Sequence, residues 1–277
     1  MKKIGFIDLS LDEWHANNYP KWFGSAPLAS EFSIAGAWER QPGARALEQW
    51  CREMRIAPFA SQEELIEHCD AFCVLAPSNP EVHEELAHAA LASGKPVFID
   101  KPFAADGAMA QRLFARADQF HTPLFSSSAL RFGEELNDAQ GRFPVEYMET
   151  QGGGSSFGEY AIHQLEMIVS TMGTGIESLM HENGGSAHHV VFRFGDGRRA
   201  AMTYHPRLAF AATLLGGNDA VKVEKCTGMF PRLIDAVMRF FKEGIAPVPR
   251  DQTIHIARVL HAAIGALQTE SRWIPVG

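Results

Sequence analysis

Short apolar runs alternate with amphipathic stretches through the first half of the chain. Residues 3–9 and 32–38 are apolar runs of strand length, and each is followed by a stretch with helical periodicity. Residues 71–76 are apolar throughout, which is typical of a parallel strand covered on both faces. Two more strands are predicted at 96–99 and 123–125. The intervening helices are predicted at 12–22, 43–54, 61–68, 79–94 and 106–120. This alternation predicts a doubly wound parallel sheet that binds ligands beyond the carboxyl ends of its strands.

The second half is richer in strands. Gly195-Asp196-Gly197 is a hairpin signal, and strands joined by tight turns indicate a mainly antiparallel sheet with helices on one face. We therefore expect an α/β Rossmann-type domain over 1–125 and an α+β domain with an open sheet over 126–277, which binds substrate and forms a homodimer or larger oligomer through 187–225. The predicted strands are 144–151, 187–194, 198–205, 209–215 and 220–225, and the predicted helices are 157–172, 229–243 and 251–270.

Composition limits the functional classes. The 277 residues are 46% apolar and 21% charged, which predicts a folded core and excludes disorder as the main state. A net charge of −8 argues against a nucleic-acid binder, and no apolar run is long enough to cross a membrane. The chain begins with a strand instead of a signal peptide, and its four cysteines form no CxxC pair. These features predict a cytoplasmic protein with reduced thiols.

Lys101 is the first candidate for chemistry. It follows a buried strand, and Pro102 restricts its backbone toward extended geometry, which aims the amine into the predicted crevice. There it could donate to a substrate hydroxyl or carbonyl, or relay protons. A solvated loop lysine is the plainer alternative.

His163 is the second candidate. Glu159, His163 and Glu166 share one face of the predicted helix, where a carboxylate one turn away could hold the imidazole as a base. An ordinary ion pair on the helix face is the alternative. The preceding run Gly152-Gly153-Gly154 allows a ligand to approach the backbone, or forms a flexible turn.

Other polar clusters are less specific. The segment 12–19 is dense in polar and aromatic groups, as a ligand site or a surface helix would be. His181, His188, His189 and His205 match no zinc spacing, and the adjacent pair must point to opposite faces of a sheet. We expect ordinary sheet histidines and no metal.

Three motifs together resemble the glucose–fructose oxidoreductase/inositol dehydrogenase (Gfo/Idh/MocA) family. Residues 76–83 (APSNPEVH) are similar to its T-P-x-x-x-H loop. Residues 94–104 (GKPVFIDKPFA) are similar to its G-K-h-V-x-x-E-K-P-x-A motif, with Asp100 replacing Glu. Residues 159–163 (EYAIH) align with its D-x-G-x-H motif, with two of the three fixed letters changed. The resemblance covers most of the chain.

The resemblance implies a nicotinamide-binding Rossmann domain, followed by an open-sheet domain, and hydride transfer at a sugar or cyclitol carbon. It implies that Lys101 binds substrate and cofactor, Glu159 orients, and His163 is the base, with Arg131 and Tyr160 at the substrate. NAD or NADP would lie against the loops at the strand ends, whose residues are Asp8, Leu9, Trp38, Glu39, Arg40, Ala76, Pro77, Asn79, His83, Asp100 and Lys101.

The glycine motif of the family is degenerate in this chain. Alignment of G-x-G-x-x-G-x-x-H on His15 puts Ile7, Leu9 and Asp12 at the three glycine positions. Those glycines normally let backbone N–H groups approach the pyrophosphate, whereas Asp8, Asp12 and Glu13 would repel it. After the second strand, Glu39 suits the ribose diol of NAD and Arg40 suits the 2′-phosphate of NADP.

Three hypotheses follow for a carbohydrate-like small-molecule ligand. The first is an NAD(P)-dependent oxidoreductase, in which His163 takes a hydroxyl proton and Lys101 polarises the oxygen. The second is a family relative without nicotinamide that performs elimination or isomerisation with the same pair. The third is a silent binding or regulatory protein that keeps the fold.

Overall fold

A computed structural model describes residues 1–269 and 271–277. Contacts divide the chain into two compact units, each of which uses two segments. Unit 1 consists of Met1–Ser127 and Phe230–Arg250, and unit 2 consists of Ser128–Met229 and Asp251–Gly277. The single boundary expected after residue 125 is therefore corrected, because the chain returns to the first unit.

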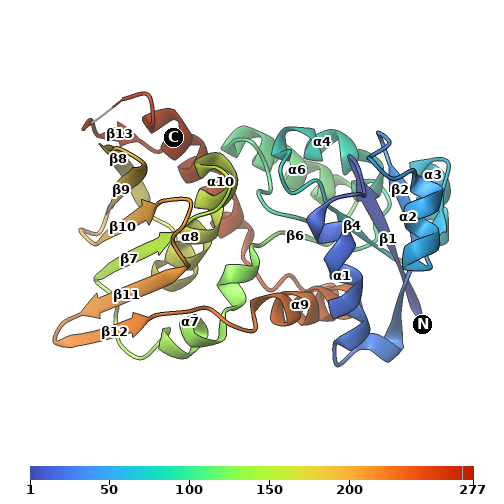
Figure 1. Cartoon of the computed structure of the whole chain (residues 1–277), viewed down its shortest axis with the longest axis horizontal. Helices are drawn as coiled ribbons and strands as arrows, with labels where there is room; N and C mark the ends of the chain where they lie inside the picture. Colours follow the sequence, from blue (N-terminus) through green and yellow to red (C-terminus); the bar gives the residue numbers. More distant parts are fainter. Residues whose placement is uncertain (270) are drawn as a thin grey trace. The chain divides into compact units, whose positions relative to one another are not determined.

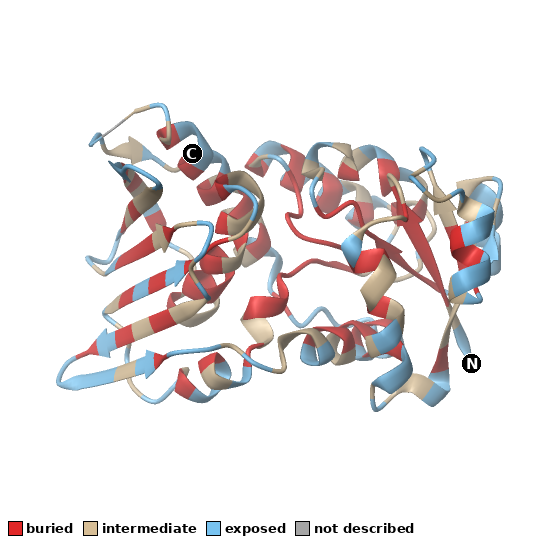
Figure 2. Ribbon diagram, in the orientation of Figure 1, coloured by how far each residue is buried: buried red, intermediate tan, exposed pale blue. Residues whose placement is uncertain are grey.

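Unit 1 is built on a six-stranded parallel sheet with the order β3-β2-β1-β4-β5-β6. The order reverses between β1 and β4, so the loops after these strands flank the ligand crevice expected in such a sheet. The apolar runs become the strands because both faces are covered, and every residue of β4 is buried (Figure 2). The strands are β1 (Lys2–Asp8), β2 (Phe32–Glu39), β3 (Ala57–Pro58), β4 (Ala71–Val74), β5 (Val97–Ile99) and β6 (Leu124–Phe125).

Helices cover this sheet. Asp106 and Ser61 accept hydrogen bonds from the first turns of α6 and α3, as their sequence positions predict. The single helix expected over 79–94 is instead a 3₁₀ turn, Pro80–Val82, followed by two short helices. The helices are α1 (Trp14–Ser25), α2 (Leu47–Met54), α3 (Gln62–His68), α4 (His83–Leu86), α5 (His88–Leu91) and α6 (Gly107–Gln119).

Helix α9 (Met229–Glu243) belongs with the first sheet, although its place in the sequence suggested the second domain. Its Phe240 ring lies edge-on to Phe125, with 4.8 Å between ring centroids. The ring of Phe230, at its first turn, stacks on Trp22 of α1 at 4.6 Å, and Figure 1 shows the two helices side by side. These aromatic contacts bury the apolar face of α9 in unit 1.

Unit 2 is a seven-stranded sheet with the order β12-β11-β7-β10-β9-β8-β13. All neighbours are antiparallel except β7 and β10. Helices α8 and α10 supply buried apolar side chains to the core on one face. The elements are α7 (Glu134–Ala139), β7 (Tyr147–Gly152), α8 (Phe157–Met172), β8 (Ile176–Gly184), β9 (Ala187–Phe194), β10 (Arg199–Tyr204), β11 (Ala211–Gly216), β12 (Asp219–Val223), α10 (Arg250–Ala266) and β13 (Ile274–Pro275).

The four cysteines are free thiols. Within the described residues, no helix is both long and apolar enough to cross a membrane. The predicted fold class, a Rossmann-type parallel sheet followed by a mainly antiparallel sheet, is confirmed.

Candidate functional site

Lys101 lies directly beyond the carboxyl end of β5. Its side chain is buried, with 8% of the residue exposed, so the alternative of a solvated loop lysine is wrong. The ammonium Nζ lies 3.5 Å from the carbonyl oxygen of Pro77, in the loop after β4. The lysine is therefore held where the ends of two neighbouring parallel strands meet.

Asp100 organises the polar groups around this lysine. Its fully buried carboxylate accepts hydrogen bonds from the Tyr19 hydroxyl at 3.2 Å and from the Lys101 backbone N–H at 2.8 Å. It also pairs with Nδ1 of His15. Burial alone would raise the pKa of Asp100, but His15 and Lys101 outweigh it and hold the pKa below its ordinary value. An ionised carboxylate thus links α1 to the end of β5.

A second buried carboxyl group, Asp8, ends β1 with 1% of its surface exposed. Its Oδ1 accepts a hydrogen bond from the Ala76 N–H at 3.0 Å, and its Oδ2 has no partner among the described residues. Burial, together with the charge of Glu13, raises the pKa of Asp8 well above its ordinary value. Asp8 therefore connects the loops after β1 and β4 through a carboxyl group whose protonated form is favoured by burial.

The loop after β4 is fixed from inside the protein. His83, expected at the cofactor, is fully buried, and its ring nitrogens lie against the carbonyl oxygens of Phe103 (3.1 Å) and Leu75 (2.6 Å). Burial lowers the pKa of His83. This corrects its predicted role, because a fully buried ring cannot touch a ligand. Pro77 is buried, and the Asn79 side chain contacts Glu81.

The loop after β2 carries the residues expected to distinguish NAD from NADP. Glu39 accepts a hydrogen bond from the Leu11 N–H at 2.9 Å, and Arg40 forms an ion pair with Glu85. Both side chains are thus engaged within the protein. Leu9 and Trp38 are half-buried at the ends of β1 and β2.

In unit 2, His163 lies on α8 and is fixed by a residue that the sequence analysis did not single out. Its Nδ1 is 2.6 Å from the hydroxyl oxygen of Ser128. The rings of Tyr160 and Phe210 lie edge-on to the imidazole, each at 5.4 Å between centroids. The histidine is thus oriented by a hydroxyl and two aromatic rings.

The expected contact between Glu159 and His163 is not formed. The Glu159 carboxylate accepts a hydrogen bond from the Ser155 hydroxyl at 2.6 Å, in the first turn of α8. Glu166, one helical turn beyond His163, accepts from the Ser128 N–H at 3.0 Å. Ser128 therefore connects His163 and Glu166, and the orienting role of Glu159 stays a prediction.

Arg131, expected to meet an anionic ligand, is paired inside unit 2. Its Nε donates to Glu166 at 2.6 Å and its Nη1 donates to Gln252 at 2.7 Å. The side chains of Arg131 and Glu166 are only 11% and 6% exposed. This ion pair joins the segment after β6 to α8 and α10, and the substrate role of Arg131 stays a prediction.

The glycine run before α8 serves close packing. A Cβ at Gly153 would lie 1.8 Å from the backbone oxygen of His205. A Cβ at Gly152 or Gly154 would lie 2.2 Å or 2.1 Å from the rings of Phe210 and Tyr160. Small residues are therefore required so that the end of β7 can lie against its own neighbours.

The adjacent sheet histidines point to opposite faces, as their spacing predicts. His188 contacts His181 with 3.0 Å between ring nitrogens, whereas His189 bonds to Thr203 at 3.0 Å. His188 also lies edge-on to Phe157 of α8, so adjacent histidines point to opposite faces. No cluster in the described part of the chain could hold a metal ion.

His15 and Tyr19 are the functional candidates that the sequence left undecided. They lie in the polar and aromatic segment 12–19, which was predicted as either a ligand site or a surface helix, and both are buried. The ring of His15 stacks on that of Tyr19 at 5.0 Å between centroids. Their spacing of four residues is the available signal, since it places both on one helix face toward Asp100.

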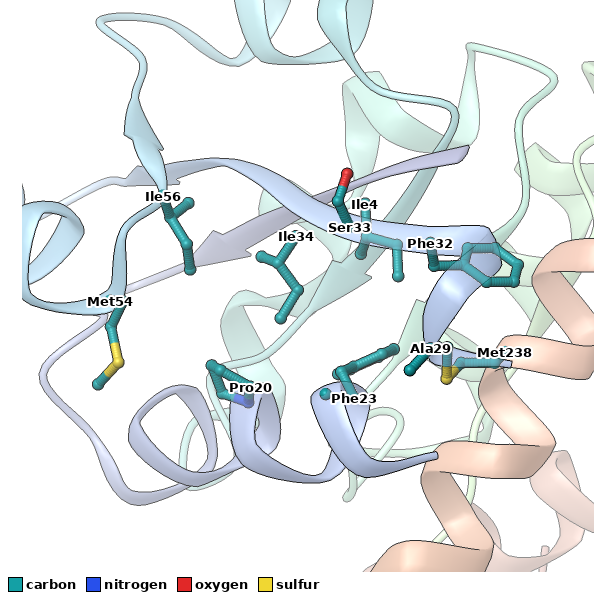
Figure 3. A pocket seen from close by; sticks show the side chains of 11 residues that line it. Ile4, Pro20, Phe23, Ala29, Phe32, Ser33, Ile34, Met54, Ile56 and Met238 are labelled. Carbon is teal, nitrogen blue, oxygen red and sulfur yellow. The ribbon is translucent and has the colours of Figure 1, made fainter. Parts of the chain in front are cut away.

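A separate apolar cavity of about 210 Å³ lies at the opposite end of the strands (Figure 3). Pro20 and Phe23 of α1 line it together with Phe32 and Ile34 of β2 and Met238 of α9. None of these residues bears a titratable group. Because it adjoins the amino end of β2, this cavity is distinct from the loops that carry Lys101.

The strand order β3-β2-β1-β4-β5-β6 is that of a Rossmann fold, and a lysine at the end of β5 marks the ligand side of the sheet. The molecule is thus of the class that joins a Rossmann unit to a second, open-sheet unit. Residues 17–127 match the model of the Gfo/Idh/MocA family, an oxidoreductase family with an NAD-binding Rossmann fold. The resemblance in the sequence motifs is thereby confirmed.

Solved structures share the fold over the whole chain. Myo-inositol 2-dehydrogenase from Lactobacillus plantarum has a TM-score of 0.81 at 13% identity, over 100% of this chain and 99% of its own. UDP-N-acetylglucosamine 3-dehydrogenase from Acidithiobacillus ferrooxidans has 0.77 at 16% identity, over 97% of both chains. The WlbA dehydrogenase from Bordetella pertussis, in complex with NADH and UDP-GlcNAcA, has 0.77 at 14% identity, over 99% and 98%. No curated protein sequence matches.

Proposed function

We propose that this protein acts on a hydroxyl-bearing, sugar-like small molecule, and that Lys101 and His163 handle the proton of its hydroxyl group. The observation that carries the proposal is the placement of Lys101, buried beyond β5 and held by the Asp100 network inside the segment that matches the family. Similar structures are dehydrogenases of inositol and nucleotide sugars, which supports this class of substrate.

The chemistry follows from the two side chains. The Lys101 ammonium donates a hydrogen bond to the substrate oxygen and stabilises negative charge that develops on it. His163 acts as the base: its proton lies on Nδ1, where Ser128 Oγ accepts it, and Nε2 takes the proton of the hydroxyl. In this proposal Ser128 orients the imidazole ring, which is the role that the sequence assigned to Glu159.

Two reactions use the same base and ammonium group. Hydride transfer begins with the hydroxyl proton, whereas elimination or isomerisation begins when the base takes a C–H proton beside a carbonyl group and the ammonium donates to the carbonyl oxygen. Hydride transfer to NAD or NADP is the usual reaction of the family, and the match over residues 17–127 favours it. Elimination or isomerisation without nicotinamide is the second, and the loop after β1 favours it. The family match begins at residue 17, so it does not include that loop.

The dinucleotide does not fit the residues that this loop presents. Ile7 and Leu11 are fully buried, so their side chains fill space next to the strand end. Asp8 Oδ1 accepts the N–H of Ala76, and Oδ2 of the same carboxyl is buried without a partner among the described residues. A backbone cradle for pyrophosphate requires glycines and free N–H groups at this place. The proton transfer proposed above uses only side chains of this chain.

The test is a turnover assay of the full chain. A panel of inositols, sugars and sugar acids is followed by NMR, with and without NAD and NADP. Replacing Lys101 or His163 by alanine should lower turnover of an active substrate by about 100- to 10,000-fold, because general acid–base catalysis supplies about that factor. The exposed Lys21 and His261, also replaced by alanine, are matched controls that should retain activity. Full activity of both Lys101 and His163 variants would exclude the proposed roles.

The panel separates the hypotheses. Product formed only with NAD or NADP identifies the oxidoreductase, and product formed without either identifies elimination or isomerisation. Binding of a panel compound with no product, in the presence or absence of dinucleotide, identifies the silent binding protein.

We also propose that unit 2 forms a homodimer through the sheet face opposite α8, within residues 187–225. Val191 and Ala201 share this face with Glu149, because their strands are in register there. A face that mixes apolar and polar side chains is typical of subunit interfaces. Light scattering at micromolar concentration should give at least twice the chain mass of 30.5 kDa. Val191→Glu should reduce that mass toward the monomer, and a monomeric unsubstituted chain would contradict the proposal.

A further inference from the structure

The N-terminus of α1 already binds a carboxylate. In a Rossmann fold that holds a dinucleotide, the pyrophosphate lies at the start of the helix after the first strand, on its free N–H groups. Here Glu13 precedes that helix and folds back, so that its carboxylate accepts the N–H of His15 at 2.7 Å and the N–H of Ala16. The position suited to a phosphate group is therefore occupied by an anion of the chain itself.

The charged form of Glu13 is stabilised by the two N–H groups that donate to it. Burial raises the pKa of Glu13, while the charge of His15 and the two N–H groups act against that rise. A pyrophosphate at the same N–H groups would leave a half-buried carboxyl group without them and add negative charge beside it. Both changes cost free energy.

Two further N–H groups of the loop after β1 are also used. The Ser10 N–H donates to Asp8 at 3.3 Å, and the Leu11 N–H donates to Glu39 at 2.9 Å. Glu39 is the residue whose place at the end of β2 suits the ribose diol of NAD. The hydrogen bond from Leu11 to Glu39 therefore engages two groups that a dinucleotide would need: an N–H group near the pyrophosphate and a carboxylate near the ribose.

The loops after β1 and β2 contact each other at the place where the adenosine of a dinucleotide would lie. Arg45 donates from Nε to Asp12 at 2.9 Å and from Nη2 to Asn17 at 2.6 Å. A Cβ at Gly43 would lie 2.5 Å from the Ser10 hydroxyl oxygen, so the two loops are in close contact. Arg45 is the cation of these loops that could neutralise a phosphate, and it forms an ion pair with Asp12 instead.

We propose that the Glu13 carboxylate takes the place of the pyrophosphate at the N-terminus of α1 in this chain, and that the crevice of unit 1 excludes NAD and NADP. The proposal goes beyond the substrate and residues proposed above. It predicts that the protein's chemistry proceeds without a dinucleotide held in this crevice.

The test is calorimetric titration of the full chain with NAD⁺, NADH, NADP⁺, NADPH and inorganic pyrophosphate, together with NADH fluorescence. We expect no saturable binding up to about 1 mM, which corresponds to a binding free energy weaker than about −4 kcal/mol. Saturable micromolar binding of any of the four dinucleotides would overturn the proposal.

Two variants test the role of Glu13 directly. Glu13→Ser keeps a good helix cap but removes the charge, and it should bind pyrophosphate at least about tenfold more tightly than the unsubstituted chain. Glu13→Asp keeps both cap and charge and should show no gain. Equal binding by the Ser and Asp variants would refute the assignment. These measurements report binding alone, so their failure would leave the roles of Lys101 and His163 unaffected, and the turnover assay stands independently.

Discussion

Asp100→Asn should destabilise the protein by about 3–5 kcal/mol at pH 7, since one member of a buried charge network is removed while the others stay. The carboxylate is fully buried and serves His15, Tyr19 and the Lys101 N–H. An asparagine offers one acceptor oxygen and no charge, so the Lys101 ammonium loses its neighbouring counter-charge. Urea unfolding of both proteins at pH 7 measures the difference.

Asp8→Asn is the matched control, because Asp8 is buried just as deeply but its pKa is shifted in the opposite direction. The pKa of Asp8 is raised well above that of the unfolded chain, first by burial, so the native state binds the extra proton. Stability from this group therefore falls as the pH rises above the unfolded pKa, and the neutral asparagine removes that loss. We expect Asp8→Asn to be as stable as the unsubstituted chain at pH 5 and more stable at pH 8. A loss of several kcal/mol in Asp8→Asn, or none in Asp100→Asn, would contradict these charge states.

Gly153→Ala should destabilise the protein by about 3 kcal/mol or more, because the added methyl group meets backbone instead of a mobile side chain. The nearest atoms are the carbonyl oxygen and carbon of His205, at 1.8 and 2.7 Å. Relief requires the end of β7 to move away from the chain that follows β10. Thermal and urea unfolding measure the loss.

Gly158→Ala, five residues later, makes the same chemical change in a place that accepts it. Gly158 lies in the first turn of α8, and its Cβ would lie 3.9 Å from Ile264, an ordinary contact. Alanine is favoured over glycine in a helix by up to about 1 kcal/mol, so this variant should be at least as stable as the unsubstituted chain. If the two variants unfold alike, the close packing of Gly153 is not a stability determinant.

Five of the six parallel strands could be predicted from the sequence because they appear as short apolar runs. The edge strand β3 was missed, since it has only two residues and both are exposed. β8 was missed for a different reason. It is interrupted by a register shift between Ile176 and Ser178, and its last three residues, 182–184, are exposed. The unit to which α9 belongs could not be predicted either, since an apolar helix face does not indicate which of the two cores it packs against.

The candidate site was predictable where position alone decides it. Lys101 follows a strand, and the edge of a parallel sheet fixes where such a residue lies. The partners of His163 and Arg131 were not predictable, because helix spacing says which residues share a face and nothing about what other segments present to that face. Ser128 reaches His163 across 35 positions of sequence. Glu159, one turn away, has a closer donor in Ser155.

The packing of α9 against the first sheet also affects the order in which the two units can fold during translation. A ribosome that has produced residues 1–127 has made all six strands of unit 1, but not the helix whose Phe240 covers Phe125. Part of the apolar surface of that sheet therefore stays uncovered until residues 230–250 leave the ribosome. By then all of unit 2 except its last segment has been synthesised. The two units therefore finish folding close together in time, and a truncated N-terminal half is expected to need a chaperone.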